Sequence, residues 1–437
     1  MAMREPEGGV APIRLYDTAS QKVVVFEPTL DPGRTVTMYT CGITPYDAAH
    51  IGHAATYIAY DVLRRRLSDR GQETKLVRNV TDVDDDILRK ARELGVHYLD
   101  LAAEEMARFS ADMEALGLLA PAVEPRATSA IPDILSFIGR VLASGHAYQA
   151  GGGVYFDVSS CPSFGAVSHY GRAEMLRLAA ERGGNPDDPN KADPLDFVLW
   201  QPSAPGEPAW DSLWGRGRPG WHIECSALAV RELGDTVDLH GGGSDLVFPH
   251  HECEAAQSQA VTGRPFVKHW MHTGMVHYNG AKMSKSLGNL VFVHDLLKQW
   301  EPAAIRLAIL AHHYRSEWVW HDGLMVEAEV RLRRWREAAG GSGDSAGRDG
   351  LGQPPARDAD RDGAPGALLA EVRAALDDDL DTPRALLAID AASRAARAGE
   401  ATRVGGAGEA TRAGDGPPAE EARGAVASAA AMLGVIV

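Results

Sequence analysis

The chain has 437 residues, of which 45% are hydrophobic, and a formal net charge of −16 at pH 7. This length and composition predict a globular protein of two or three domains with a sizeable core. The acidic balance gives the chain no long-range attraction for polyanions, so nucleic acid is disfavoured as its main partner. Two basic runs, Arg64 to Arg66 and Arg331 to Arg334, are interpreted as solvated helix faces.

Four scattered cysteines in a chain of this length do not form a disulfide framework, so they indicate a reducing compartment. Residues 1–9 are charged and lack an apolar core, which excludes a signal peptide. No apolar run approaches the length of a membrane-spanning helix. We therefore expect a cytoplasmic protein with no membrane partner.

Strand-like and helix-like segments alternate in the first part of the chain and again later. We expect strands at 23–26, 35–40, 74–77, 154–158, 196–200 and 266–272, and helices at 54–67, 87–94 and 131–143. Such alternation predicts an α/β protein with a doubly wound parallel sheet, whose ligands bind at the carboxyl ends of the strands. The acidic loop Asp82 to Asp86 follows one of these strands. It lacks the ligand spacing of a calcium loop, and Asp82 is interpreted as a helix cap.

The chain is expected to divide into a catalytic domain with an insertion and a small helical end. The predicted divisions are 1–115 and 206–300 for the two halves of the nucleotide-binding catalytic domain, 116–205 for an inserted α+β subdomain, 301–338 for two stem helices, 339–366 for a linker, and 367–437 for a short helical C-terminal region.

The loop Cys41 to His53 lies between an expected strand and an expected helix. Helix N-termini have unpaired backbone N–H groups and a favourable dipole, so this position suits an anionic ligand. Gly52 allows a ligand to approach the backbone closely. His50 and His53 can donate hydrogen bonds to phosphate oxygens. The alternative is a plain strand-to-helix turn with two solvated histidines.

A second motif, Lys282-Met283-Ser284-Lys285-Ser286, lies more than two hundred residues later. Together the two motifs resemble the paired hallmarks of class I aminoacyl-tRNA synthetases, which implies their Rossmann-like core. The resemblance also implies that His50, His53, Lys282 and Lys285 stabilise the ATP phosphates together with Mg²⁺. It further implies that Gly52 and Lys285 bind ATP, that Gly243 and Asp245 hold the ribose, and that Met275 and Val276 flank the adenine.

Cys41, Cys225, His250 and Glu254 form a candidate metal site. His250 and Glu254 are four residues apart at the start of an expected helix, so both can face one point. Two thiolates, an imidazole and a carboxylate suit tetrahedral zinc. The spacing alone favours two buried cysteines without a ligand, and Cys161 and Cys253 are interpreted as packing residues.

The surroundings of these residues resemble cysteinyl-tRNA synthetases and their relatives, the mycothiol-pathway cysteine:glucosaminyl-inositol ligases. The resemblance implies one zinc ion that binds the thiolate of substrate cysteine, and it places Trp221, Thr44 and Thr81 in the amino-acid pocket. Serine has the same shape but a poor zinc-binding hydroxyl, so such a site selects cysteine without editing.

Local sequence favours the ligases, for example at 41–47, 181–186 and 311–315. About 110 residues follow the catalytic core, with few aromatics or basic clusters, which is too little to read an RNA loop. We expect a monomer that uses L-cysteine, ATP and glucosaminyl-inositol, without tRNA. Glu254 and Arg78 are synthetase-like, however. A truncated cysteinyl-tRNA synthetase, a paralogue with another amine acceptor and an inactive cysteine-binding paralogue therefore remain alternatives.

Overall fold

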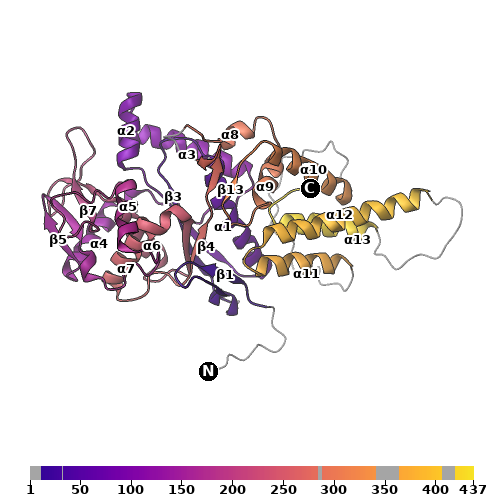
Figure 1. Ribbon diagram of the computed structural model, residues 1–437, viewed down its shortest axis with the longest axis horizontal. Coiled ribbons are helices and arrows are strands. Elements are labelled where there is room, and N and C mark those ends of the chain that lie inside the picture. The colour runs from indigo at the N-terminus through magenta and orange to yellow at the C-terminus, as the bar shows by residue number, and fades with distance from the viewer. Residues whose placement is uncertain (1–10, 32, 284–287, 341–363, 406–418) are drawn as a thin grey trace, which may run out of the picture.

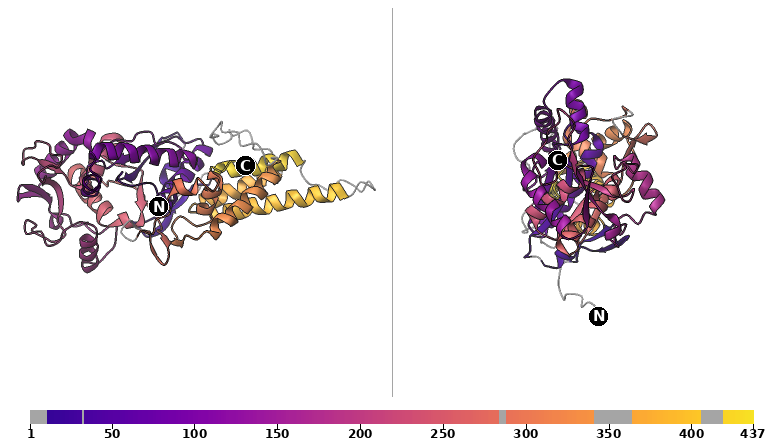
Figure 2. Two further views of the ribbon diagram at one scale, coloured as in Figure 1. Left: turned by 90° about the horizontal axis from the view of Figure 1, so that it is seen from above. Right: turned by 90° about the vertical axis from the view of Figure 1, so that its left-hand side faces the viewer.

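The computed structural model describes residues 11–31, 33–283, 288–340, 364–405 and 419–437. The molecule is elongated (Figures 1 and 2), with a parallel sheet in the middle, a smaller α+β unit at one end and a helical bundle at the other. None of the described helices combines the length and apolar content that a membrane crossing requires.

The central sheet has four parallel strands in the order β10 (Trp270–Thr273), β9 (Leu239–Gly243), β3 (Val36–Ile43) and β4 (Thr74–Val80). From β3 the chain passes to β4 on one side, and from β9 it passes to β10 on the other. The strand order therefore reverses between β3 and β9, where a doubly wound sheet binds its ligands. The expected fold class is confirmed.

Helix α1 (Ile51–Asp69) connects β3 to β4. Ala54, Ile58 and Val62 are fully buried and follow one another at intervals of four residues, so they form one face of the helix against the sheet. The helix begins at Ile51, three residues before the expected start, because His50 caps it.

The inserted unit contains an antiparallel sheet of β5 (Ala147–Ala150), β6 (Gly153–Phe156), β7 (Phe197–Pro202) and β8 (Gly217–Pro219), with helices α4 (Ile131–Ala143) and α5 (Arg172–Glu181). It lies at the left of Figure 1. Its last strand ends at Pro219, past residue 205, where we expected the insertion to end. Helices α2 (Asp85–Leu94) and α3 (Tyr98–Ala115) precede it.

The C-terminal half of the chain adds α9 (Pro302–Leu310), α10 (Gly323–Ala339), α11 (Ala364–Asp377), α12 (Thr382–Gly405) and α13 (Ala419–Met432). Helices α9 and α10 occupy the segment interpreted as the stem, whereas most of the expected linker lies outside the described residues. Smaller strands are β1 (Arg14–Asp17), β2 (Lys22–Val25), β11 (Val276–Tyr278), β12 (Ala281–Lys282) and β13 (Trp318–Val319).

The basic run of α1 is not a solvated helix face, contrary to our interpretation of the sequence. Arg65 bonds Asp61 at 2.8 Å, and Arg66 bonds Asp377 of α11 at 2.8 Å. Both arginines are buried. The other basic run also forms an ion pair within the protein, between Arg334 of α10 and Asp390 of α12 at 2.7 Å. These charges hold the C-terminal helices to the rest of the molecule.

Arg306 of α9 is the centre of the most deeply buried of these networks. Its side chain is fully buried, pairs with Asp61 of α1, and donates to the carbonyl oxygens of Leu116 at 3.2 Å and Leu433 at 2.5 Å. One guanidinium therefore joins α1, the end of α3 and the residues after α13. Removal of this arginine therefore leaves Asp61 with Arg65 as its remaining cation and takes the donor from two carbonyl groups.

Replacement of Arg306 by Met is therefore expected to lower the free energy of unfolding by about 3 kcal/mol, because two buried carbonyl groups lose their donor and a buried carboxylate loses one of its two cations. The shift is measured by urea unfolding followed by circular dichroism. Arg336, whose ion pair with Glu301 is partly exposed, is the matched control: Arg336→Met should cost less than about 1 kcal/mol. Equal effects of the two substitutions would contradict the assigned role of Arg306.

Candidate active site

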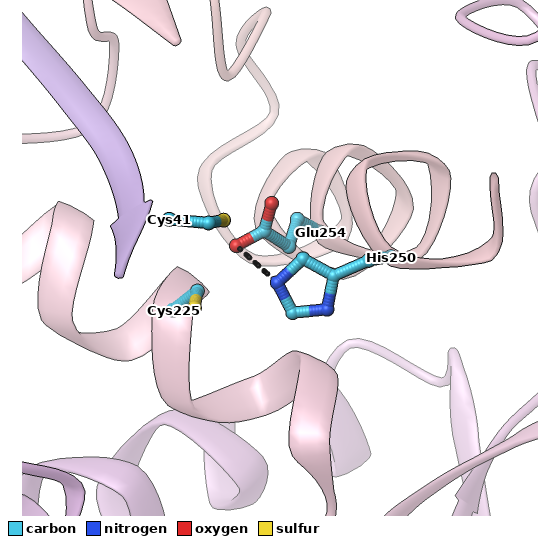
Figure 3. Close-up of side chains that lie close together, drawn as sticks. All are labelled: Cys41, Cys225, His250 and Glu254. Atoms are coloured by element: carbon cyan, nitrogen blue, oxygen red, sulfur yellow. Dashed lines mark ion pairs between the residues drawn. The ribbon is translucent and has the colours of Figure 1, made fainter. Parts of the chain in front are cut away.

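Four buried side chains converge at the carboxyl end of β3. The ligand atoms of Cys41, Cys225, His250 and Glu254 all lie within 4.8 Å of one another. Figure 3 shows the side chains pointing toward one centre, from the end of a strand and from two helices. His250 Nε2 lies 3.6 Å from a carboxylate oxygen of Glu254, as the spacing of four residues predicted. The four residues that the sequence analysis named are thus brought together.

Local packing places Cys41 and Cys225 at this point. Gly42 follows Cys41 at a place where a Cβ would lie 1.5 Å from the carbonyl oxygen of Asn79, so only glycine lets β3 and β4 approach here. The Tyr57 hydroxyl donates to the Cys41 carbonyl at 3.1 Å. Cys225 lies in α6 (Trp221–Leu233), which covers the ends of β3 and β4.

The electrostatics of the four residues fit a bound cation. Burial raises the pKa of Cys225 to about 11 and that of Cys41 well above its usual value. Burial also raises the pKa of Glu254, and it lowers that of His250 well below the usual value. Among the described residues, Oε1 of Glu254 has no hydrogen-bond partner although it is buried. A metal ion would satisfy that oxygen and favour both thiolates, so the donor set fits one.

Neighbouring histidines orient the set. His222 Nδ1 lies 2.9 Å from His250 Nδ1. The other ring nitrogen of His250, Nε2, therefore faces the cluster. His240 bonds Glu254 Oε2 at 2.8 Å and the Tyr39 carbonyl at 3.0 Å. Cys41, His240, His251 and Glu254 form a second group of suitable spacing. His240 already uses both ring nitrogens, so the first group is the better metal site. The sequence analysis missed these histidines, although the pair His250-His251 was visible in it.

Of the three residues expected around substrate cysteine, Trp221 packs against this cluster, and Thr44 and Thr81 lie at the ends of two neighbouring strands. Trp221 is the first residue of α6, and its ring lies 4.3 Å from that of His250. Thr44 directly follows β3 and Thr81 directly follows β4. The Thr81 N–H donates to the Ile43 carbonyl at 3.1 Å, so the two threonines lie at adjacent strand ends. Their contact with a substrate stays a prediction.

His50 and His53 lie together at the start of α1. Their rings stack with centroids 3.8 Å apart. His50 Nδ1 accepts from the Gly52 N–H at 3.1 Å, and His53 Nδ1 accepts from the His50 N–H at 3.4 Å. Because each Nδ1 accepts, the neutral rings carry their protons on Nε2, which is then the donor that a phosphate oxygen would need.

The helix N-terminus differs from the expectation in one respect. The Ile51 N–H donates to the Val291 carbonyl at 2.8 Å, and the Gly52 N–H donates to His50. The first N–H groups of α1 are thus not all unpaired. A Cβ at Gly52 would lie 2.9 Å from the His50 ring, so the glycine makes room for that ring. A role of Gly52 in binding ATP stays a prediction.

The residues expected around the nucleotide gather at the ends of β9 and β10. Gly243 ends β9 and Asp245 follows in a short 3-10 helix. A Cβ at Gly243 would lie 3.7 Å from Met275 Sδ, so Met275 lies beside it, and Val276 begins β11. The backbone of Lys282 lies in β12. Lys285 lies outside the described residues.

The acidic loop after β4 also differs from the expectation. Asp82 does not cap a helix, because it accepts from the Thr128 N–H at 2.9 Å and from the Thr128 hydroxyl at 2.6 Å. Asp84 caps α2 instead, through the Asp86 N–H at 3.3 Å.

Glu224, one residue before Cys225, is fully buried. The sequence analysis did not single it out, since nothing in a helical pattern marks a buried glutamate.

The comparison with known families agrees with this geometry. Residues 28–330 match the family described as the class I (C) tRNA synthetase catalytic domain. The match spans more than half of the chain and contains every candidate site residue named above. The chain therefore belongs to this family.

Curated relatives narrow the family further. The L-cysteine:1D-myo-inositol 2-amino-2-deoxy-alpha-D-glucopyranoside ligase of Thermobispora bispora is 49% identical to this chain and is aligned over 88% of it and 90% of the relative. The ligases of that name from Streptosporangium roseum and Streptomyces coelicolor are 47% and 49% identical, with 91% and 88% of their lengths covered. At this identity and coverage, the chain belongs with these ligases within the larger family.

Solved structures show the same fold at much lower identity. The methionyl-tRNA synthetase of Mycobacterium tuberculosis, in complex with methionyl-adenylate, has a TM-score of 0.62 at 17% identity, with 92% of this chain and 89% of that chain covered. A leucyl-tRNA synthetase of Agrobacterium radiobacter has a TM-score of 0.62 at 11% identity, with 92% and 84% covered. Both support the class I architecture.

Metal binding at the four-residue cluster should release protons. Because burial holds the thiols of Cys41 and Cys225 protonated at neutral pH, binding of Zn²⁺ should release about two protons and weaken as the pH falls. A zinc titration of the metal-free protein in weak buffer measures the release. Cys225→Ser should reduce it, whereas Cys161→Ser should leave it unchanged. Proton release that does not depend on Cys225 would exclude this residue as a ligand.

Proposed function

We propose that the protein is an ATP-dependent ligase that adenylates L-cysteine and transfers it to the amine of glucosaminyl-inositol, a step of mycothiol biosynthesis. The observation that carries the proposal is the buried cluster of two cysteines, a histidine and a glutamate beside the phosphate-side histidines of α1. The identity of nearly one half to ligases with this name supports the choice of substrates.

Zinc is the metal that suits the cluster best, because it takes sulfur, nitrogen and oxygen donors together and two sulfur donors disfavour a hard ion. When bound, it would supply a Lewis acid to which the sulfur of substrate cysteine can be added as a further donor. Cys41, Cys225, His250 and Glu254 would hold it, and Trp221 packs beside His250 to shape the pocket wall. Serine has no comparable affinity for such an ion, which explains selection without a second hydrolytic site.

Adenylation would use the two histidines at the start of α1. The cysteine carboxylate attacks the α-phosphorus of ATP, a P–O bond forms, and the bond to pyrophosphate breaks. His50 and His53 donate from Nε2 to the phosphate oxygens as charge develops on them. Lys282, Lys285 and Mg²⁺ stabilise the leaving pyrophosphate. Gly243 and Asp245 hold the ribose, and Met275 and Val276 flank the adenine.

Transfer uses the adenylate as an activated acyl group. The neutral amine of the acceptor attacks the carbonyl carbon, a C–N bond forms, the C–O bond of the mixed anhydride breaks, and AMP leaves. Attack leaves a positive charge on the nitrogen, which then loses one proton, and the products are an amide and AMP. A small acceptor needs no RNA-reading surface, and several charged residues of the C-terminal helices form ion pairs with α1 and with one another.

Two departures from the ligase pattern do not oppose this acceptor. Arg78 bonds Glu124 and lies over the rings of Tyr57 and Phe109, so it is a packing residue of β4. Glu254 belongs to the metal cluster. The proposal includes a cytoplasmic monomer that does not require tRNA. A truncated cysteinyl-tRNA synthetase is the second candidate, favoured by the synthetase-like residues Glu254 and Arg78.

The metal pocket should determine which amino acid is activated. Wild-type protein loaded with zinc is expected to catalyse ATP–pyrophosphate exchange with L-cysteine more than about 100-fold better than with L-serine, because only the thiolate binds the metal strongly. Cys225→Ser should abolish the exchange, and Cys161→Ser should not change it. Exchange with serine at a comparable rate would refute the role of the metal.

The identity of the acceptor is tested directly. Purified protein with ATP and radiolabelled L-cysteine is offered either glucosaminyl-inositol or tRNA, and the labelled product is separated. We expect cysteinylation of the amino sugar alone. Cysteinyl-tRNA as the only product would establish the second candidate, whereas exchange without either product would indicate a different amine acceptor. A lack of any exchange would support the cysteine-binding paralogue.

A further inference from the structure

The inserted unit contacts a segment that joins the two sides of the candidate active site. Residues 245–254, which we call the connecting segment, contain Asp245 of the expected ribose site and the metal-cluster residues His250 and Glu254. The segment begins in a short 3-10 helix, and the chain leaves helical geometry at Phe248, with φ of −142° and ψ of 136°. Because regular helical hydrogen bonding is interrupted at such a break, the path of the segment depends on its surroundings.

Arg182 holds the first part of the connecting segment. It directly follows α5, and its guanidinium donates to the carbonyl oxygens of Asp245 and Phe248. The two carbonyls are three residues apart, so one planar cation spans the stretch from the expected ribose residue to the break in the helix. Bonds from a charged donor are stronger than those between neutral groups. Arg182 therefore restrains the backbone that leads from the nucleotide side toward His250.

Glu252 holds the second part of the segment with the opposite charge. It is a buried residue at the start of α7, two residues before Glu254. Its carboxylate accepts from the N–H groups of Gly165 at 2.7 Å, Val167 at 3.2 Å and Ser168 at 2.8 Å. Gly165 has a φ of +103°, a conformation that favours glycine and lets the loop turn these N–H groups toward one point. The inserted unit thus supplies the donors that a buried carboxylate requires.

Aromatic rings of the same loop contact the segment between these two points. Phe164 and Tyr170 lie at the two ends of the loop, and both meet the ring of Phe248 edge-on, with centroids 6.1 and 6.3 Å apart. Phe248 is buried. The inserted unit therefore holds the connecting segment at three successive places, through a cation, an aromatic cluster and an anion.

We propose that Arg182 and Glu252 are positioning residues of the ligase reaction, through which the inserted unit sets the geometry of the active site. The inference rests on the proposed function, in which Asp245 holds the ribose and Glu254 is a metal ligand. Arg182 acts on the nucleotide side, because it bonds the backbone of Asp245 itself. Glu252 acts on the metal side, because it anchors the first turn of α7, which carries Glu254.

Two measurements on zinc-loaded protein separate these effects. ATP–pyrophosphate exchange gives the KM for ATP and the KM for L-cysteine, and competition with a chromogenic chelator gives the affinity for zinc. The variants are Arg182→Met and Glu252→Gln, with Arg182→Lys and Glu252→Asp as second variants that keep the charge. Arg177→Met and Glu181→Gln are the matched controls, because these residues pair with each other at the surface of α5.

Arg182→Met should raise the KM for ATP about ten-fold, because the backbone of Asp245 loses a charge-assisted bond, and should change the zinc affinity less than about two-fold. Glu252→Gln should weaken zinc binding about ten-fold and change the KM for ATP less than about two-fold, because its amide N–H₂ meets backbone donors instead of accepting from them. Both controls should behave as wild type, and Arg182→Lys should show a smaller rise in the KM for ATP than Arg182→Met.

A merely structural role would lower the melting temperature and the fraction of folded protein without changing the KM values or the zinc affinity of the folded molecules. That result would overturn the inference, as would equal changes on both sides of the site in both variants. If Arg182→Met or Glu252→Gln does not fold, the charge-keeping variant at that position decides by the same measurements. Wild-type protein that neither retains zinc nor exchanges pyrophosphate would instead refute the proposed function, and the inference with it.

Discussion

Four ligand groups buried at one point impose the main constraint on this structure. Two thiols, an imidazole and a carboxylate lie within 4.8 Å of one another, out of contact with water. Without a cation, burial opposes the charge of each group, and Glu254 keeps an oxygen without a partner. The ends of β3, α6 and α7 (Glu252–Thr262) must therefore be held firmly enough to preserve a geometry that a bound cation would favour.

Parallel-sheet topology explains why sulfur chemistry and phosphate chemistry meet here. The strand order reverses between β3 and β9, so the carboxyl ends of both strands border one crevice. Cys41 lies at the end of β3 among the four candidate metal ligands, whereas His50, a few residues later, caps α1. Under the proposed function, one short segment would thus supply both the amino-acid side and the nucleotide side of the site.

The sequence predicted those features that depend on neighbouring residues, and it failed for those that depend on distant contacts. The alternation of strands and helices gave the sheet, and the spacing of His250 and Glu254 gave their contact, because both are properties of neighbouring residues. Arg66 was misread as solvated because its partner, Asp377, lies 311 residues away. Asp82 and Asp84 were exchanged as caps because a run of acids does not show which one meets Thr128. The burial of Glu224 depends on packing between α6 and the ends of two strands, which no local pattern records.

The hydrogen bond between Arg306 and the Leu433 carbonyl connects the catalytic domain to the far end of the described chain. The same guanidinium contacts Asp61 of α1, the helix whose first turn carries His53. A deletion of the few residues after α13 would thus remove a contact that supports α1, although the two segments are far apart in sequence. The ion pairs of α11 with α1 have the same effect, so a protein shortened before α11 would lose part of what holds its catalytic domain.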